Sequence, residues 1–206
     1  QAKAFESKSL DVLAHKLQLM YNNIIWNFHE NIKICTYLEE TYLNRPLSEV
    51  VVDLSSKEIA QQKVYAYHYR GMVEEGAKYA SQSLSLFKSG TYEWFNFMEY
   101  YFLVLMKGER YKDATILFRK IRTNKNYNNL ETLEKERWQI HRAFLLYTNN
   151  SKLLRWGFDL EQFLNSQPNY PKEYWGYNVS TLVIQFMYLL RDGHIEELRE
   201  CVENLD

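Results

Sequence analysis

The sequence predicts an all-α protein in which about five antiparallel helix pairs stack side by side as an α-solenoid. Apolar residues recur at three- and four-residue steps along most of the chain, which is the spacing of amphipathic helices. Hydrophobic residues make up 46% of the 206 residues, so a core is available. Only 7 Gly and 3 Pro are present, which argues against a turn-rich all-β fold.

The clearest helix pair is predicted at residues 91–123. Thr91 is a suitable N-cap for the first helix, and Gly108 ends that helix. The apolar stripe of the first helix comprises Trp94, Met98, Phe102 and Leu105, and that of the second comprises Tyr111, Ala114, Phe118 and Ile121.

The remaining pairs are expected at residues 9–45, 55–88, 129–165 and 171–205. The first begins with one long helix over residues 9–28, which ends at a turn at His29-Glu30. Ser55 and Glu58 form a capping box that starts the next pair. Further helices are expected at residues 31–43, 55–70, 73–87, 130–147, 152–165, 171–190 and 195–205, and residues 47–54 form a packed connector.

The five predicted pairs share one register. The first apolar residues of the second helices recur about every 40 residues, at Ile32, Val73, Tyr111, Leu153 and Ile195. Three residues later stand Cys35, Gly76, Ala114, Trp156 and Leu198. Six residues earlier stand Trp26, Tyr67, Leu105, Tyr147 and Leu189. We therefore expect equivalent columns to occupy equivalent places in the core.

Three turn-and-helix motifs resemble the tetratricopeptide repeat family. Residues 71–76, 109–114 and 193–198 are similar to the family's Gly-Asp-Tyr-Glu-Glu-Ala turn and the helix that follows it. The resemblance implies a right-handed superhelix whose concave groove, lined by first helices, holds an extended peptide or another protein. The period of about 40 residues exceeds the family's period of about 34, so the resemblance is to tetratricopeptide-like helical repeats.

The register also selects candidate groove residues on the first helices. They are Asn27, Gln61, Tyr65, His68, Asn96, Glu99, Tyr100, His141 and Arg142. Asn and Gln side chains can pair with the backbone of an extended peptide. For any single one of these residues, a plain solvated helix position is the favoured alternative.

A basic cluster is predicted around the second helix of the central pair. It comprises Arg110, Lys112, Arg119, Lys120, Arg122 and Lys125. The cluster is either an exposed outer helix or a patch for an acidic protein segment or nucleic acid. The net charge of −1 argues against nucleic acid.

No residue cluster predicts a reaction centre, a metal site or a cofactor site. Adjacent carboxylates such as Glu74-Glu75 point about 100° apart on a helix and do not converge. No stretch is apolar enough to span a bilayer. Cys35 and Cys201 form no CxxC motif, which favours a reduced, cytoplasmic compartment.

We therefore expect a non-catalytic interaction or scaffold module that binds a protein or peptide. Two alternatives stay open: a peptide-sensing regulatory domain attached to an effector domain outside this sequence, and an all-α enzyme. Gln1 is not an initiator residue, so we expect that an upstream segment has been removed. The first helix should then present apolar surface that an upstream segment or a second copy of the chain covers.

Overall fold

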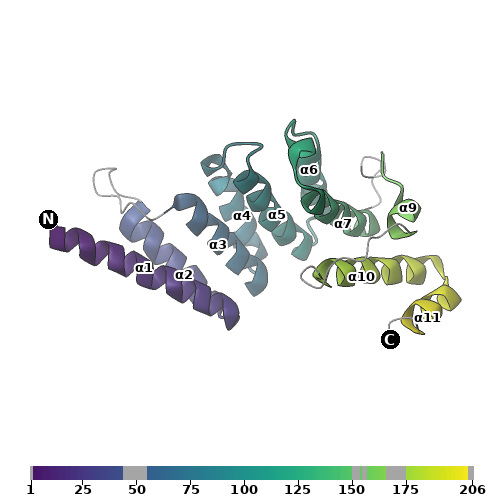
Figure 1. The fold of residues 1–206 in the computed structure, drawn as a ribbon, viewed down its shortest axis with the longest axis horizontal. Coiled ribbons are helices and arrows are strands. Elements are labelled where there is room, and N and C mark those ends of the chain that lie inside the picture. Colours follow the sequence, from purple (N-terminus) through teal and green to yellow (C-terminus); the bar gives the residue numbers. More distant parts are fainter. Residues whose placement is uncertain (1, 44–54, 150–153, 155–156, 166–174, 204–206) are drawn as a thin grey trace.

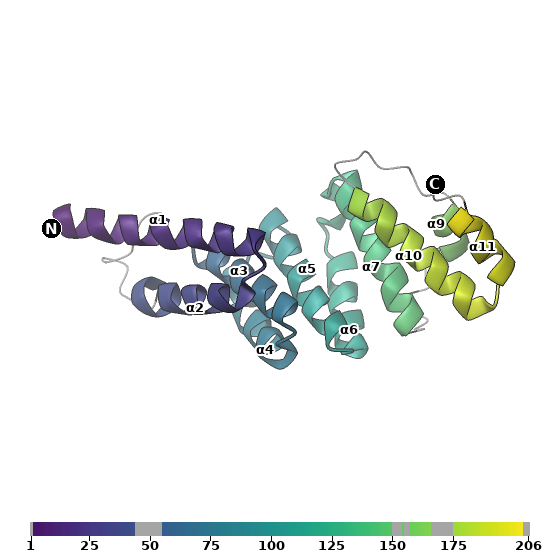
Figure 2. The same ribbon diagram turned by 90° about the horizontal axis from the view of Figure 1, so that it is seen from below.

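The computed structural model describes residues 2–43, 55–149, 154, 157–165 and 175–203, and every regular element in these ranges is helical. Successive helices pack against one another along the long axis, with α1 and α11 at opposite ends (Figures 1 and 2). The α-helices are α1 (Ala2–Ile24), α2 (Phe28–Leu38), α3 (Ser56–Arg70), α4 (Val73–Ser83), α5 (Tyr92–Lys107), α6 (Tyr111–Arg122), α7 (Thr132–Thr148), α9 (Leu160–Asn165), α10 (Trp175–Asp192) and α11 (Ile195–Glu203).

The turn between α1 and α2 comes earlier than predicted. The long helix ends at Ile24, and Asn27 is the N-cap of α2, so the predicted turn at residues 29–30 is wrong. Trp26 adopts a φ of 60°, which reverses the chain within three residues. Phe28, the first residue of α2, is buried.

The end of α2 also departs from the predicted regular helix. Residues Glu39–Leu43 form a π-helix, η1. Within η1, the Glu39 carboxylate accepts hydrogen bonds from the ammonium of Lys63 on α3 and the hydroxyl of Tyr79 on α4. This partly buried cluster therefore ties three consecutive elements together. The predicted connector at residues 47–54 lies outside the described residues.

Helix caps confirm the predicted starts of the two central pairs. The Ser55 hydroxyl accepts a hydrogen bond from the Glu58 backbone N–H at 3.5 Å, and Thr91 caps α5 through the Trp94 N–H at 3.3 Å. The helix after residue 73 is shorter than predicted, because Leu84–Leu86 form a 3-10 turn. The polar loop before α7 likewise contains a 3-10 turn, Tyr127–Asn129.

The core of the described residues centres on α5. Its fully buried side chains include Trp94, Phe97, Met98, Phe102 and Leu105. Helices α3, α4 and α6 pack around α5, which explains why α5 is apolar on more than one face.

The predicted columns are buried unevenly. In the column of first apolar residues, Ile32, Val73 and Tyr111 are half-buried and Ile195 is 54% exposed. In the column three residues later, Cys35, Gly76 and Ala114 are buried and Leu198 is half-buried. Leu153 and Trp156 lie outside the described residues. In the column predicted six residues earlier, Leu105 is buried and both Tyr67 and Tyr147 are half-buried. Trp26 in the same column is 70% exposed, because the chain has already left α1.

The C-terminal third differs most from the prediction. The continuous helix predicted at residues 152–165 is wrong, because Gly157 adopts a φ of 64° and α9 starts only at Leu160. The predicted start of the next helix at Pro171 lies outside the described residues. None of the helices in the described part of the chain combines the length and apolar character that a membrane span requires.

Candidate functional site

Two clefts open on the side of the molecule that carries the polar side chains of α3, α5 and α7. The larger, of about 710 Å³, lies between the start of α5, the loop before α7, the first turns of α7, and Tyr177 of α10. The smaller, of about 260 Å³, is lined by Asn23, Gln61, Gln62, Tyr65 and Tyr100. Taken together, the lining of the two clefts includes residues of α1, α3, α5, α7 and α10, which are the first helices of the five predicted pairs.

The larger cleft combines aromatic, amide and charged groups. Its lining residues are Gly90, Tyr92, Phe95, Asn126, Asn129, Leu130, Glu131, Leu133, Glu134, Arg137 and Tyr177. Its volume falls within the range of about 300–1,000 Å³ that is typical of ligand sites.

The rim of the larger cleft is held by backbone contacts. The Asn126 amide donates to the Gly90 carbonyl at 2.9 Å and so fixes the loop against the start of α5. Gly90 has a φ of 81°, and a Cβ there would lie 2.8 Å from atoms of Asn124 and Asn126. On the opposite rim, Glu131 and Glu134 form a reciprocal capping box at the start of α7. The cleft therefore has a preformed shape.

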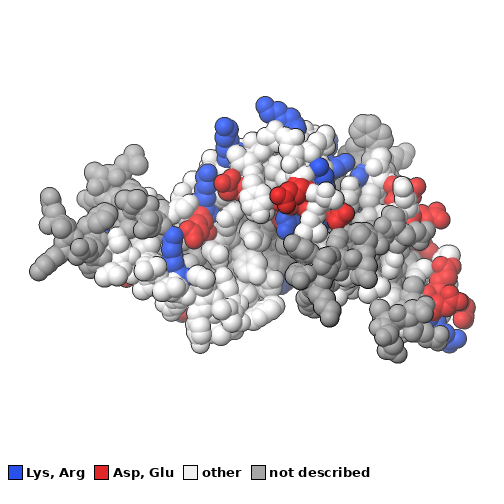
Figure 3. Space-filling view, in the orientation of Figure 1, with Lys and Arg blue, Asp and Glu red and all other residues white. Residues whose placement is uncertain are grey.

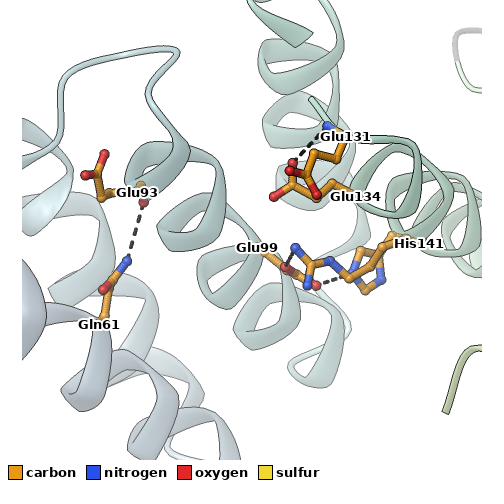
Figure 4. Close-up of polar contacts among 7 residues, drawn as sticks. Gln61, Glu93, Glu99, Glu131, Glu134 and His141 are labelled. Carbon is orange, nitrogen blue, oxygen red and sulfur yellow. Dashed lines mark hydrogen bonds and ion pairs between the residues drawn. The ribbon is translucent and has the colours of Figure 1, made fainter. Parts of the chain in front are cut away.

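A buried carboxylate joins α5 to α7 beside this cleft. Glu99 is only 8% exposed. It pairs with the Arg137 guanidinium at 3.0 Å and with His141 Nε2 at 2.9 Å, as Figure 4 shows for Glu99 and His141. Because each charge has a partner, the trio can hold the two helices in register.

Aromatic rings continue from the smaller cleft toward the α1–α2 turn. The ring centroids of Tyr65 and Tyr100 lie 5.4 Å apart, and Tyr65 and Tyr69 lie 4.6 Å apart. Tyr69 in turn stacks on Phe28 at 4.6 Å. Burial raises the pKa of Tyr65 and of Tyr100 above the usual tyrosine range, so both hydroxyls stay protonated and can donate hydrogen bonds.

Several predicted groove residues lie at the two clefts. Gln61, Tyr65 and Tyr100 line the smaller cleft, and the Gln61 amide donates to the Glu93 carbonyl at 3.4 Å (Figure 4). Asn96 and His68 are half-buried. Their roles in binding stay predictions.

Three candidate groove residues do not occupy the exposed first-helix positions that were predicted for them. Asn27 lies in the α1–α2 turn and not on a first helix. Glu99 is buried rather than exposed, because α7 supplies its charged partners. Arg142 is 3% exposed, and its Nε donates to the Leu154 carbonyl at 2.7 Å while its guanidinium covers the Phe158 ring.

The structure adds cleft residues that the sequence did not single out. Asn126 and Asn129 belong to a loop that showed only polar composition. Arg137 stands in step with the apolar residues of α7, so its spacing indicated a core position. Tyr177 lines the cleft because α10 packs on α7, a contact between distant segments that spacing alone does not predict.

The predicted basic patch is only partly an exposed surface. Lys112, Arg119, Lys120 and Lys125 are exposed. Arg110, however, pairs with Asp113 at 2.7 Å and Glu74 at 3.5 Å, and Arg122 covers the Tyr127 ring at 4.3 Å. In Figure 3, Lys and Arg follow the upper edge over α4 and α6, and Asp and Glu gather over the centre and at the α11 end.

Comparison of the chain with protein-family models, with curated proteins and with solved structures finds no match. Within the described ranges, no group of three or more His, Cys, Asp or Glu side chains is placed to hold a metal ion.

Proposed function

We propose that this chain is a non-catalytic protein–protein interaction module, built as a tetratricopeptide-like α-solenoid, that binds an extended peptide segment across α3, α5 and α7. The observation that carries the proposal is the cleft of about 710 Å³ beside the Glu99–Arg137–His141 trio. Successive packing of the helices and burial of Cys35, Gly76 and Ala114 at one register position support the repeat architecture.

The cleft chemistry suits a peptide better than a small polar metabolite. Tyr92, Phe95 and Tyr177 offer aromatic surface, and Asn129 offers an amide that can pair with peptide backbone. An extended segment leaves its backbone N–H and C=O groups open to such pairing. The smaller cleft lies further along the same row of helices, so one segment could contact both.

The charges favour a basic side chain in the bound segment. Glu131 and Glu134 face the cleft with negative charge, while the charge of Arg137 is already opposed by Glu99. The capping bonds of these two carboxylates go to backbone N–H groups, so a Lys or Arg of the peptide placed near the start of α7 could add an ion pair to them.

Binding rather than catalysis is the role that the ionisable groups support. Glu99, Arg137 and His141 pair with one another. Cys35 is a free, buried thiol, and burial raises the pKa of Cys35 to about 12, so it is not a ready nucleophile at neutral pH. The proposal invokes no metal or cofactor. The cytoplasmic location stays a prediction.

Selection of a random linear peptide library on the immobilised 206-residue chain tests this function. We expect enrichment of peptides with basic residues, and a Tyr92→Ala variant should weaken the binding of an enriched peptide by about tenfold or more in fluorescence anisotropy. Tyr92 is 62% exposed, so its removal should leave the fold intact.

The matched control is Ile116→Ala on α6, which is 61% exposed and lines neither cleft. It should bind as the unmodified chain does. The proposal is contradicted if no peptide is enriched, or if Tyr92→Ala and Ile116→Ala affect the binding equally.

A further inference from the structure

Helix α1 carries an apolar stripe that faces away from the rest of the molecule. The stripe consists of Leu10, Leu13, Leu17, Met20 and Ile24, each between 52% and 76% exposed. The opposite face of α1 supplies Val12 and Leu19 to the core that it shares with α2 and α3. The stripe is therefore not needed to attach α1 to its neighbours.

The spacing of the stripe is that of a helix–helix seam. Its members follow one another at alternating steps of three and four residues, which is the heptad pattern of coiled coils. A heptad seam fits another helix with the same seam better than it fits a flat surface. In Figures 1 and 2, α1 lies at one end of the row with α2 beside it.

The exposed area is sufficient for a specific pair. Tyr21 of α1, and Ile25 and Trp26 in the turn that follows α1, lie near this end of the molecule and are 60%, 48% and 70% exposed. Together the eight side chains offer on the order of 600 Å² of apolar surface, given about 60–120 Å² for a fully exposed aliphatic side chain and about 150–250 Å² for an aromatic one. Two such surfaces would bury about 1,200 Å², the lower end of the range for specific interfaces.

The charges beside the stripe favour a second copy of the same helix. Lys16 is paired with Glu58 at 2.9 Å, and Asn23 is bonded to Gln62 and Asn31 within the same chain. The remaining flanks, Ala14 and Tyr21, are uncharged. Along the stripe at residues 10–24, two copies of α1 can therefore meet without unpaired like charges beside the seam, whereas a strongly charged partner would find Lys16 already paired.

The other end of the molecule fits α1 less well. Helix α11 also exposes apolar residues, Ile195 and Val202, but these are interleaved with exposed Glu196, Glu197 and Glu200. Docking α11 on α1 would bring these carboxylates to a seam whose flanking cation, Lys16, is already paired with Glu58. It would also be a head-to-tail contact, and assemblies built from such contacts keep adding copies unless they close into a ring.

We propose that the chain forms a two-fold symmetric dimer in which the α1 stripe of one copy packs against the α1 stripe of a second copy. This dimer leaves the α5–α7 cleft uncovered, so a pair would present two peptide sites. The inference is independent of what the cleft binds.

Sedimentation velocity of the 206-residue chain over about 1–100 μM tests the dimer, in the range expected for an interface of modest size. We expect a monomer–dimer equilibrium that stops at two copies. Leu17→Glu, at a position 57% exposed, should weaken the dimer at least about tenfold. Ile116→Glu, which places the same charge on exposed α6, should leave it unchanged.

A charge-complementation experiment tests the symmetry. Leu17→Glu and Leu17→Lys should each be monomeric alone, and an equimolar mixture should recover dimers, because residue 17 is the middle of the stripe and in this dimer lies beside its counterpart at the two-fold axis. Far-ultraviolet circular dichroism checks that both variants stay folded. A monomeric unmodified chain, growth beyond two copies, a dimer that survives Leu17→Glu, or a mixture that stays monomeric would each overturn the proposal.

Discussion

Gly76 marks a close contact among three helices of the described core. A Cβ at this position would lie 2.9 Å from the Cβ of Tyr67 on α3 and 3.2 Å from Cγ1 of Val104 on α5. The Cβ of Tyr67 is attached to backbone and cannot swing aside. Glycine is therefore required by the close approach of three helices, even though it disfavours a helix interior.

We predict that Gly76→Ala lowers the free energy of unfolding by about 1–3 kcal/mol through overpacking, although alanine is the better helix former. Gly176 on α10 is the control, because a Cβ there meets nothing within 4 Å. Gly176→Ala should stabilise the fold by about 0.4–1 kcal/mol. Urea unfolding measures both, and a Gly76→Ala midpoint at or above that of the unmodified chain would refute the contact.

Ala114 occupies the register position equivalent to Gly76 and is fully buried. Ala114→Leu should cost about 1–3 kcal/mol by overpacking. Phe118, one turn later, is 4% exposed and packs near Phe102 and Trp138. Phe118→Ala should cost about 3–5 kcal/mol because it leaves a cavity. Unchanged urea midpoints for the two variants would show that the register of α6 is wrong.

His68 makes stability depend on pH. Burial, assisted by nearby Lys107, lowers the pKa of His68 below its usual value, and its Nδ1 atom is buried without a hydrogen-bond partner. In the unfolded chain His68 binds a proton below about pH 6.5, whereas the folded chain resists it. The stability of the folded state should therefore fall as the pH drops from about 7 to 5.

A His68→Gln variant isolates this contribution. The free energy of unfolding of the unmodified chain minus that of the variant should decrease as the pH drops from about 7 to 5, because only the unmodified chain carries the histidine. Urea titrations at each pH supply the two values. A difference that is constant, or that grows as the pH falls, would mean that His68 is not held neutral by the fold.

Helices α5 and α7 are joined by charge as well as by apolar packing. Glu99 is buried, and Arg137 and His141 converge on it from one face of α7. Glu99→Gln removes the negative charge and leaves the Arg137 guanidinium without its carboxylate partner. Because Arg137 is partly exposed, solvent screening reduces the effect.

We predict that Glu99→Gln costs about 1–3 kcal/mol of stability and weakens peptide binding in the adjacent cleft. Exposed Glu74, whose contact with Arg110 is 3.5 Å, provides the matched control, and Glu74→Gln should change stability by less than about 0.5 kcal/mol. Equal effects of the two substitutions in urea unfolding would argue against a role of Glu99 in joining the helices.

The existence of most helices could be predicted because their signals are local. Ser55 and Thr91 cap helices through their own side chains, and the apolar stripe of α5 repeats over sixteen residues, Tyr92–Lys107. Such features depend on few neighbours, so sequence spacing is sufficient to find them.

The features that were missed depend on tertiary contacts or on single backbone angles. Trp26 continues the helical apolar phase, so nothing local showed that its backbone leaves the helix. The π-helix at Glu39–Leu43 places Glu39 beside Lys63 and Tyr79, which come from later helices. Arg142 matched an exposed position in the register, but a segment about twelve residues later covers it.

Register predicted some of the helix positions that line the clefts, but it did not predict the shape of the clefts. Gln61, Tyr65 and Tyr100 were found from register alone because they lie on regular helices. The loop residues Asn126 and Asn129, and Tyr177 from α10, reach the larger cleft only through the packing of separate segments. Sequence periodicity does not predict which separate segments pack against one another.

At the scale of the whole molecule, the helices form a row with different surfaces along it. The α1 end carries the uncharged apolar stripe, the centre carries the clefts, and acidic side chains gather at the α11 end (Figures 1 and 3). In a stacked array each pair contacts mainly its neighbours, so a segment bound along the row should protect several helices at once.

Hydrogen–deuterium exchange of the chain with and without a library-selected peptide tests the binding face most directly. A peptide bound across α3, α5 and α7 should slow exchange in α3, in the first turns of α5, in residues 123–131 and in α7, with little change in the exposed half of α6. Protection confined to α4 and α6, or to the α11 end, would contradict the assignment of the peptide site to the α3, α5 and α7 face.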